Sequence, residues 1–208
     1  MLPPTMDEQT GSGRDHSPVL QGLALVGALA AAMWVVEVVD QVAGGSLDRN
    51  GIQPRDADGI DGVLWAPFLH DGFQHLIGNT VPFLLLGIGI ALGGIARVAA
   101  VTAIVALIGG LGTWLVAPEN TNHIGASGLV FGYASYLVAR GAFTRSLAQI
   151  AMGLVVVVVW GTTLLRGLVP ETGISWQGLL FGAVGGVLAA WLLHRRRAAR
   201  PTEPATVG

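Results

Sequence analysis

Six long apolar segments dominate this chain and restrict what it can fold into. They lie at roughly residues 19–43, 73–93, 95–117, 125–140, 146–168 and 175–193. A helix needs about 20 apolar residues to cross the hydrocarbon core of a bilayer, and the fourth segment is the shortest of the six. Only 12% of the residues are charged, which is about half the fraction in soluble domains. The chain is therefore predicted to be an all-α polytopic membrane protein, a bundle of six transmembrane helices.

Polar stretches flank this membrane domain, which is predicted to span residues 19–193. Residues 1–18 are expected to form a disordered tail, because acids outnumber basic residues there, whereas a signal peptide starts with basic ones. Residues 194–208 are basic and then contain prolines, which indicates a second tail. Between the first two helices, residues 44–72 form a long loop, and we expect Trp65 to anchor it at the membrane interface.

The positions of the arginines predict how the helices are oriented, because cytoplasmic loops are enriched in arginine and lysine. If six helices alternate in direction, one side of the membrane carries Arg97, Arg140, Arg145, Arg195, Arg196, Arg197 and Arg200. The opposite side carries Arg49, Arg55 and Arg166. Both termini are therefore expected in the cytoplasm and the long loop outside, in a protein of the plasma membrane.

Composition argues against several kinds of site and partner. The chain has no cysteine, so it has no disulfide, thiolate metal ligand or cysteine nucleophile. The formal net charge is −2 without a basic block, which argues against nucleic acid as a partner. The histidines are scattered and form no cluster with acids, so neither a metal nor another cofactor is expected. Membrane lipids and transmembrane proteins are the expected partners.

Polar residues inside apolar segments are energetically costly, so they are candidates for function. Ser127 lies in the motif GASG, residues 125–128, at the start of the fourth segment. His75 and Asn79, four residues apart on one helix face, open the second segment. The predicted orientation places these residues and the start of the last helix at one depth near the outer face. A serine nucleophile with histidine and asparagine as oxyanion donors is one interpretation.

Close helix packing is the alternative explanation, because glycine and serine let membrane helices approach each other. The glycines near Ser127 and in the last segment suit such packing; they are Gly125, Gly128, Gly132, Gly178, Gly182 and Gly186. His75 or Asn79 could equally form a hydrogen bond between helices. Glu37 and Asp40, near the outer end of the first segment, are interpreted as interfacial residues or anchors of the long loop.

Together these motifs resemble those of the rhomboid family of intramembrane serine proteases. The stretch "HIGASGLVFGY" resembles the nucleophile motif of the family, and "FLHDGFQHLIGNT" resembles its helix 2 motif. The resemblance covers roughly residues 20–193 and implies a rhomboid-like bundle of six helices. It also implies that Ser127 is the nucleophile, that His75 and Asn79 form the oxyanion hole, and that "SWQG" followed by "FGAVGG" opens the last helix.

The chain departs from the family at one position. The family carries its general-base histidine in the pattern His-x-x-Gly-x-x-x-Gly on the last helix, and Gly182 and Gly186 supply both glycines. The histidine position is then occupied by Leu179, which cannot accept a proton. In a soluble serine protease, loss of the base lowers turnover by about 10⁶-fold. Phe131, one turn after Ser127, could pack against a histidine placed at residue 179.

The expected function is therefore that of a rhomboid-family membrane protein with serine-endopeptidase ancestry but impaired catalysis, a pseudoprotease that binds transmembrane clients. One alternative is an active intramembrane serine protease in which His123, four residues before Ser127, or His75 serves as an unusual base. A channel or transporter is a weaker alternative, because no segment carries midplane charges or paired broken helices.

Overall fold

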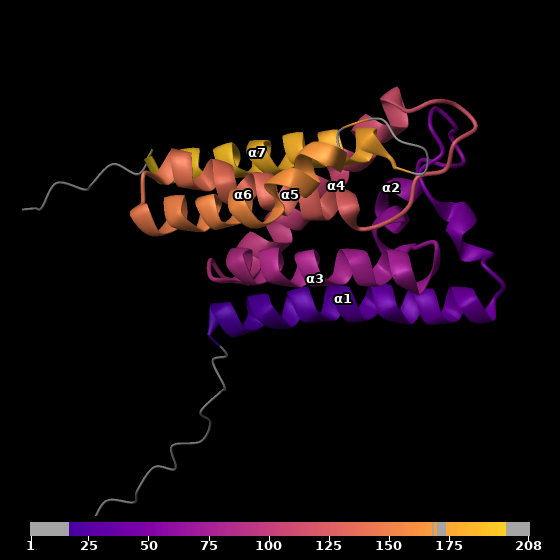
Figure 1. The fold of residues 1–208 in the computed structure, drawn as a ribbon, viewed down its shortest axis with the longest axis horizontal. Helices are drawn as coiled ribbons and strands as arrows, with labels where there is room; N and C mark the ends of the chain where they lie inside the picture. The colour runs from indigo at the N-terminus through magenta and orange to yellow at the C-terminus, as the bar shows by residue number, and fades with distance from the viewer. Residues whose placement is uncertain (1–16, 168, 170–173, 199–208) are drawn as a thin grey trace, which may run out of the picture.

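Helices make up most of the part of the chain that the structure, a computed structural model, describes: residues 17–167, 169 and 174–198. The long helices are α1 (Pro18–Val42), α3 (Gly72–Ala91), α4 (Ile95–Val116), α5 (Ser127–Thr144), α6 (Leu147–Gly167) and α7 (Trp176–Ala198). Three short ones lie between α1 and α3 (Figure 1): η1 (Leu47–Asn50), α2 (Gly62–Trp65) and η2 (Ala66–Phe68). Most of the two tails predicted at residues 1–18 and 194–208 lies outside the described residues.

The six apolar segments of the sequence correspond to the six long helices, and the predicted all-α membrane class is confirmed. By length and composition, α1, α3, α4 and α7 can cross a membrane. α5 is 18 residues long and less apolar, and the apolar part of α6, Leu147–Thr163, is shorter than a full span. The described residues therefore support four membrane spans, and the count of six remains a prediction.

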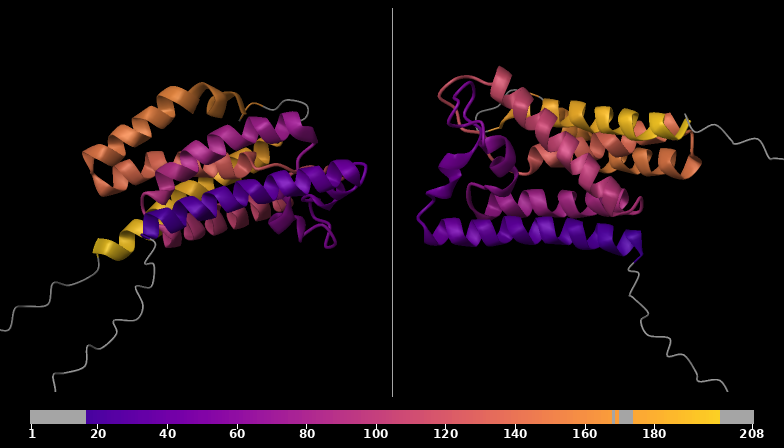
Figure 2. Two further views of the ribbon diagram at one scale, coloured as in Figure 1. Left: turned by 90° about the horizontal axis from the view of Figure 1, so that it is seen from below. Right: turned by 180° about the vertical axis from the view of Figure 1, so that it is seen from behind.

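The long helices lie side by side in one bundle (Figures 1 and 2). α1 packs on α3 and α4, α7 packs on α5 and α4, and α6 packs on α5. α1 begins and α7 ends at the same end of the bundle, and the segment with η1, α2 and η2 lies at the opposite end (Figure 1). This arrangement is the one expected of a chain that crosses a membrane an even number of times.

α5 occupies the centre of the bundle, where it contacts α3, α4, α6 and α7. Its Tyr133 is fully buried and stacks on Phe83 of α3, with the ring centroids 5.3 Å apart. The Tyr133 hydroxyl shares a hydrogen bond of 2.5 Å with the hydroxyl of Thr102 in α4. Because a buried hydroxyl needs a partner, this contact fixes α5 against both α3 and α4.

Glycines bring the backbones of α5 and α7 into contact. A Cβ atom added to Gly128 would lie 3.2 Å from the Gly178 carbonyl oxygen. A Cβ atom added to Gly182 would collide with the Gly128 carbonyl, and one added to Gly186 with the Gly132 carbonyl. Small residues are the ones that permit such an approach between membrane helices. The first turn of α7 is thereby held against the first turn of α5.

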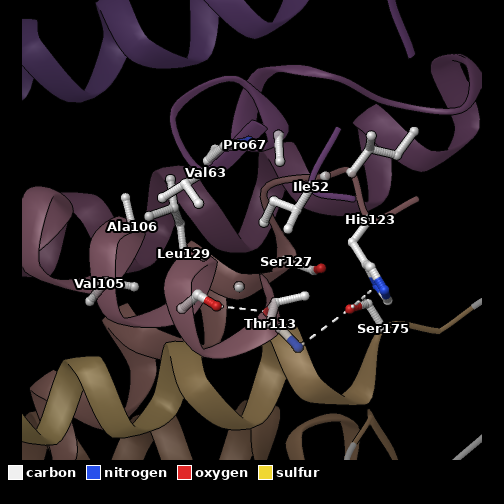
Figure 3. Close-up of a pocket in the computed structure, with 17 residues that line it drawn as sticks. Ile52, Val63, Pro67, Val105, Ala106, Thr113, His123, Ser127, Leu129 and Ser175 are labelled. Atoms are coloured by element: carbon white, nitrogen blue, oxygen red, sulfur yellow. Dashed lines mark hydrogen bonds between the residues drawn. The ribbon is translucent and has the colours of Figure 1, made fainter. Parts of the chain in front are cut away.

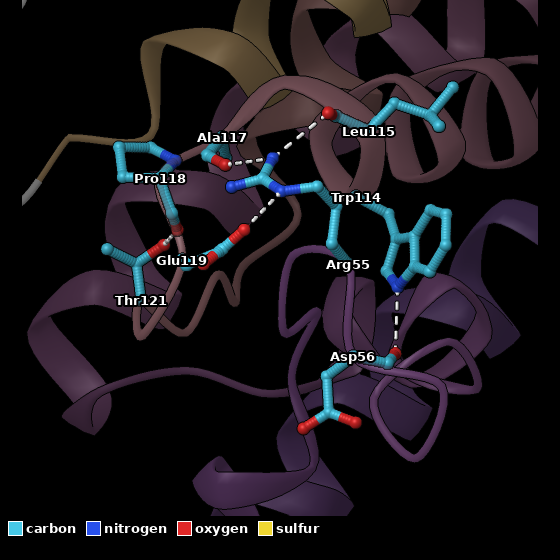
Figure 4. Close-up of polar contacts among 8 residues, drawn as sticks. All are labelled: Arg55, Asp56, Trp114, Leu115, Ala117, Pro118, Glu119 and Thr121. Atoms are coloured by element: carbon cyan, nitrogen blue, oxygen red, sulfur yellow. Dashed lines mark hydrogen bonds and ion pairs between the residues drawn. The ribbon is translucent and has the colours of Figure 1, made fainter.

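The segment between α1 and α3 is docked onto the end of α4 (Figure 4). The Arg55 guanidinium donates hydrogen bonds to the backbone carbonyls of Leu115 and Ala117, at 3.0 and 2.8 Å. It also pairs with the Glu119 carboxylate at 3.0 Å. These contacts satisfy carbonyl groups at the end of α4 that have no partner within the helix. The long segment is therefore an ordered part of the fold.

Two acidic residues at the end of α1 are buried, Glu37 and Asp40, each with 1% of its surface exposed. The Asp40 carboxylate accepts a hydrogen bond from the Leu47 backbone N–H at 2.6 Å. The Glu37 carboxylate accepts one from the Gln41 side chain at 2.8 Å. Asp40 thus anchors the start of the long segment, which is one of the two roles that the sequence suggested.

Candidate functional site

A large open cavity of about 1480 Å³ lies at the end of the bundle that holds the long segment. The first turns of α3, α5 and α7 line it, together with the end of α6 and the residues just before α5. The lining includes residues that the sequence singled out: His75, Asn79, His123, Ser127, Phe131 and Leu179. Residues from helices far apart in the sequence thus meet at one place.

Ser127 is the first residue of α5 and borders this cavity. Gly125, two residues earlier, has a φ angle of 108°, which residues with a Cβ atom rarely adopt. This conformation turns the chain sharply into the helix, where the first backbone N–H groups have no intrahelical acceptor. Among the described residues, none forms a hydrogen bond with the Ser127 hydroxyl.

His75 and Asn79 lie in the first two turns of α3, next to the Gly125 turn. A Cβ atom added to Gly125 would lie 2.8 Å from both Cε1 and Nε2 of the His75 ring, and 3.8 Å from Asn79 Nδ2. The Asn79 amide also donates to the His75 carbonyl at 3.2 Å. Two side chains that can donate hydrogen bonds therefore lie beside the turn that precedes Ser127.

His70 supports the same turn from inside the protein. Its side chain is fully buried, and its Nε2 accepts a hydrogen bond from the Ala126 backbone N–H at 3.3 Å. Its ring meets the His75 ring edge to face, with the centroids 5.1 Å apart. Burial, and then the neighbouring His75, lower the pKa of His70 to about 4, so the ring is neutral at pH 7 and can accept. From the sequence, His70 was assigned no role.

Leu179 lies in the first turn of α7 and is 4% exposed. A Cβ atom added to Gly167, at the end of α6, would lie 2.8 Å from Leu179 Cδ1 and 2.6 Å from Phe131 Cζ. The Leu179 and Phe131 side chains therefore meet the end of α6 and form an apolar part of the cavity wall. In the described residues, no histidine nitrogen forms a hydrogen bond with Ser127.

His123 is held by side chains on both sides of its ring. Nδ1 forms a hydrogen bond with Ser175 Oγ at 2.7 Å, and Nε2 forms one with Thr121 Oγ1 at 2.8 Å. The backbone of His123 pairs with that of Ile52 in the long segment, with N–H to carbonyl distances of 2.9 and 3.0 Å. Burial lowers its pKa. Sequence reasoning gave Ser175 no role, because 52 residues separate it from His123.

A second pocket of about 50 Å³ adjoins the cavity, and Ser127, His123 and Ser175 line both. Figure 3 shows these three residues at one side of the smaller pocket. Because each His123 nitrogen already has a hydroxyl partner, the ring has no free lone pair for the Ser127 hydroxyl in this arrangement.

Three charged side chains line the cavity. They are Asp48 in η1, Asp71 directly before α3, and Arg166 at the end of α6. Burial raises the pKa of Asp48 to about 6, and the nearby carboxylates of Asp40, Glu37 and Asp71 add to this effect. Over the described residues, no group of three or more histidines and acids is arranged to hold a metal ion.

Comparison with known families identifies this arrangement. The Rhomboid domain matches residues 60–196, which include the lining of the cavity from α3 to α7. The chain belongs to the rhomboid family. The match includes all the motifs that carried the resemblance in the sequence, from Phe68 to Gly186.

Individual relatives agree with this assignment. An uncharacterized protein of Mycobacterium tuberculosis is 43% identical to this rhomboid-family chain over 200 residues, covering 88% of the chain and 83% of the relative. An uncharacterized protein of Mycobacterium leprae is 44% identical over 172 residues, which cover 78% of this chain and 68% of the relative. YdcA of Bacillus subtilis is 28% identical over 133 residues, which cover 64% of this chain and 66% of YdcA. Its name assigns it provisionally to the rhomboid proteases.

Proposed function

We propose that this rhomboid-family protein binds transmembrane client proteins at the cavity beside Ser127 and cleaves them poorly or not at all. In this proposal Ser127 occupies the nucleophile position, His75 and Asn79 are the oxyanion donors, and Leu179 occupies the position of the general base. The single observation that carries the proposal is the buried leucine in the first turn of α7, at the cavity that Ser127 also borders.

The glycine contacts between α5 and α7 support this placement of residue 179. Gly182 lies against Gly128. Leu179 lies one turn before Gly182 on α7, Ser127 directly precedes Gly128 on α5, and both line the cavity. A histidine at residue 179 could therefore face the serine, whereas a leucine offers no proton acceptor. Removal of the base from a serine protease lowers turnover by about 10⁶-fold, or roughly 8 kcal/mol in activation free energy.

Binding of a transmembrane segment is supported by the size and lining of the cavity. A segment that leaves its helical conformation in a membrane must satisfy its backbone N–H and C=O groups on the protein. The wall offers suitable side chains from three elements, among them Gln74, Asn122 and Gln177. The cavity therefore suits the polar or irregular end of a transmembrane helix better than a regular apolar helix.

Photo-crosslinking in liposomes tests client binding. A photoreactive amino acid is placed at Thr163, which lines the cavity, or at Val158, which is 75% exposed on the same helix and lies outside it. Single-span proteins are then reconstituted with each variant. We expect crosslinks from residue 163 to one end of a client helix, and weaker ones from residue 158. Equal crosslinking from both positions would show random lipid-phase encounters and would overturn the proposal.

An active protease is the second candidate, because His123 lines the same cavity as Ser127 and His75 lies against the turn before it. In that case the His123 ring would have to exchange one hydroxyl partner for Ser127. Ser127-dependent cleavage of a single-span substrate by the unaltered protein would support this candidate. The variants His123→Ala and His75→Ala would then distinguish the two bases.

We further infer that the protein lies in the plasma membrane with both termini in the cytoplasm. The arginine positions support this orientation. α1 begins and α7 ends at the same end of the bundle, which is consistent with both termini lying on one side of the membrane.

A further inference from the structure

We propose that Ser175 and His123 form a second nucleophile–base pair, separate from Ser127, which reacts with carboxylic esters that enter the cavity. This goes beyond the proposed function, which assigns Ser175 no role. The Ser175 oxygen lies 2.7 Å from His123 Nδ1, and both residues line the large cavity. Ser175 thus has what Ser127 lacks, a histidine nitrogen at hydrogen-bond distance.

The directions of the hydrogen bonds follow from the groups around His123. The Thr121 hydroxyl donates to the Pro118 carbonyl at 2.5 Å, so its oxygen must accept from His123 Nε2–H. A neutral imidazole carries one N–H, which leaves Nδ1 as the acceptor. Ser175 O–H therefore donates to Nδ1. The Ser175 oxygen in turn accepts from the Gly178 backbone N–H at 3.3 Å.

This order of groups is the one that activates a serine: a hydroxyl donates to an imidazole, and a third group orients the ring. Thr121 is that third group here. Burial lowers the pKa of His123, so the ring is neutral at pH 7 and can accept the proton. Ser175 directly precedes the 23-residue helix α7, whose N-terminal end stabilises negative charge on nearby oxygens.

Gln177 provides a candidate donor for the negative charge that develops during attack. Its side chain is 6% exposed and lines the large cavity. In the part of the chain that the structure describes, no hydrogen bond occupies its carboxamide. Because this side chain lines the cavity, its amide N–H groups can donate to a ligand oxygen there.

The reaction is written for a carboxylic ester. Ser175 Oγ bonds to the carbonyl carbon while its proton moves to His123 Nδ1. The tetrahedral intermediate collapses when the bond to the alcohol oxygen breaks, and that oxygen takes the proton from Nδ1. Water then attacks acyl-Ser175 through the same two steps, which release the carboxylic acid and return a proton to Ser175. Esters are favoured over amides because an alkoxide leaves more readily than an amide anion.

A fluorophosphonate probe tests the pair in the full-length protein in detergent. Ser175 Oγ would bond to phosphorus, fluoride would leave, and the proton would move to His123. Cleavage after arginine places Ser127 on the peptide of residues 98–140 and Ser175 on that of residues 167–195, where Ser175 is the only serine. Mass spectrometry therefore identifies the labelled site directly.

We expect an adduct on residues 167–195 that is absent from Ser175→Ala. His123→Asn should label at least about 100-fold more slowly, because a general base contributes about 10²- to 10⁴-fold. Thr121→Val, which keeps the base but removes its orienting hydroxyl, should label at an intermediate rate. If His123→Asn does not fold, the Thr121→Val rate and the site of the adduct still test the pair.

An unlabelled 167–195 peptide, or labelling of His123→Asn or Thr121→Val at the unaltered rate, would overturn the inference and leave Ser175 as a helix-capping residue. An adduct on residues 98–140 that disappears in Ser127→Ala would instead contradict the proposed loss of activity at Ser127. The two proposals therefore fail by different results.

Discussion

Gly182 of α7 lies against the backbone of Gly128 in α5 so closely that a methyl group on Gly182 would collide with the Gly128 carbonyl. The obstacle is backbone rather than a flexible side chain, so relief requires the two helices to separate. Leu179 lies one turn before Gly182 and Ser127 directly precedes Gly128, so the spacing between Leu179 and Ser127 depends on this contact.

Gly182→Ala is expected to destabilise the protein by about 3 kcal/mol, the upper range for overpacking a core. For a chain of this size, that corresponds to a decrease of roughly 6 to 12 °C in the melting temperature. The matched control is Gly27→Ala in α1, where an added Cβ atom meets nothing within 4 Å. In thermal unfolding in detergent, that control should be as stable as the unaltered protein or more stable by up to about 1 kcal/mol, because alanine is the better helix former. Similar melting temperatures for both variants would contradict the proposed contact.

The docking of the long segment depends more on Arg55 than on its ion pair. Glu119→Gln should lower stability by less than about 1 kcal/mol, because 68% of the Glu119 side chain is exposed and such pairs are weak. Arg55→Ala also removes the hydrogen bonds to the Leu115 and Ala117 carbonyls, and should lower stability by about 2 kcal/mol. Thermal unfolding of both variants provides the comparison. A larger loss of stability in Glu119→Gln than in Arg55→Ala would contradict this prediction.

His70→Ala should destabilise the turn before Ser127. It leaves the buried Ala126 N–H without an acceptor, which costs about 1–3 kcal/mol. His70→Gln, whose side-chain oxygen can accept a hydrogen bond, should recover part of the loss. Melting temperatures of the two variants give the measurement. An alanine variant as stable as the glutamine variant would show that the hydrogen bond does not support the turn.

Stability should decrease as the pH falls from about 6.5 to 4. His70 has a pKa of about 4 in the folded protein and 6.5 in the unfolded chain, so the unfolded chain takes up the proton first as the pH falls. The difference between these two pKa values corresponds to a loss of at most about 3 kcal/mol in the free energy of unfolding. Asp48, with its pKa raised to about 6, acts in the opposite sense: its contribution is present below about 3.8 and is lost as the pH rises through 6. Its effect is smaller because it is partly exposed and screened.

Two variants separate these contributions. Asp48→Asn should steepen the loss of stability on acidification, and His70→Gln should reduce it. The measurement is the free energy of unfolding at several pH values between 4 and 7. A steeper acid loss in His70→Gln than in the unaltered protein would show that the assigned sign is wrong.

The sequence was sufficient for the helices and the family, because both depend on local pattern. Apolar segments of about 20 residues predict membrane helices wherever the chain folds, and these segments match α1 and α3 to α7. The motifs that contain His75, Ser127 and Leu179 are local too, and a resemblance to the family was enough to predict that they meet. The structure brings them to one cavity.

Contacts between loops could not be predicted in the same way. The hydrogen bond from Ala126 to His70 joins residues 56 positions apart, and the one between His123 and Ser175 joins residues 52 positions apart. Neither pair follows from helical periodicity, since all four residues lie before helices rather than within them. Such pairings are set by how the long segment and the helix ends fit together, which requires the folded structure.

The substitution Leu179→His provides the most direct test of the central claim, that Ser127 lacks only its base. An imidazole buried without a partner would cost about 1–3 kcal/mol, but Ser127 can supply one, and Phe131 can pack against the ring. A general base contributes about 10²- to 10⁴-fold, so the variant should cleave a single-span substrate at least about 100-fold faster than the unaltered protein. Leu179→Gln, which is polar but not basic, and Leu179→His combined with Ser127→Ala are the controls and should remain inactive.

The measurement is the rate of cleavage of that substrate in liposomes by the unaltered protein and by Leu179→His. The account predicts Ser127-dependent cleavage that appears with the histidine. Equal, Ser127-dependent cleavage by both proteins would contradict it, because the chain would then already contain a base. Absence of cleavage by the folded variant would also contradict it, because more than the base would then be missing from the site.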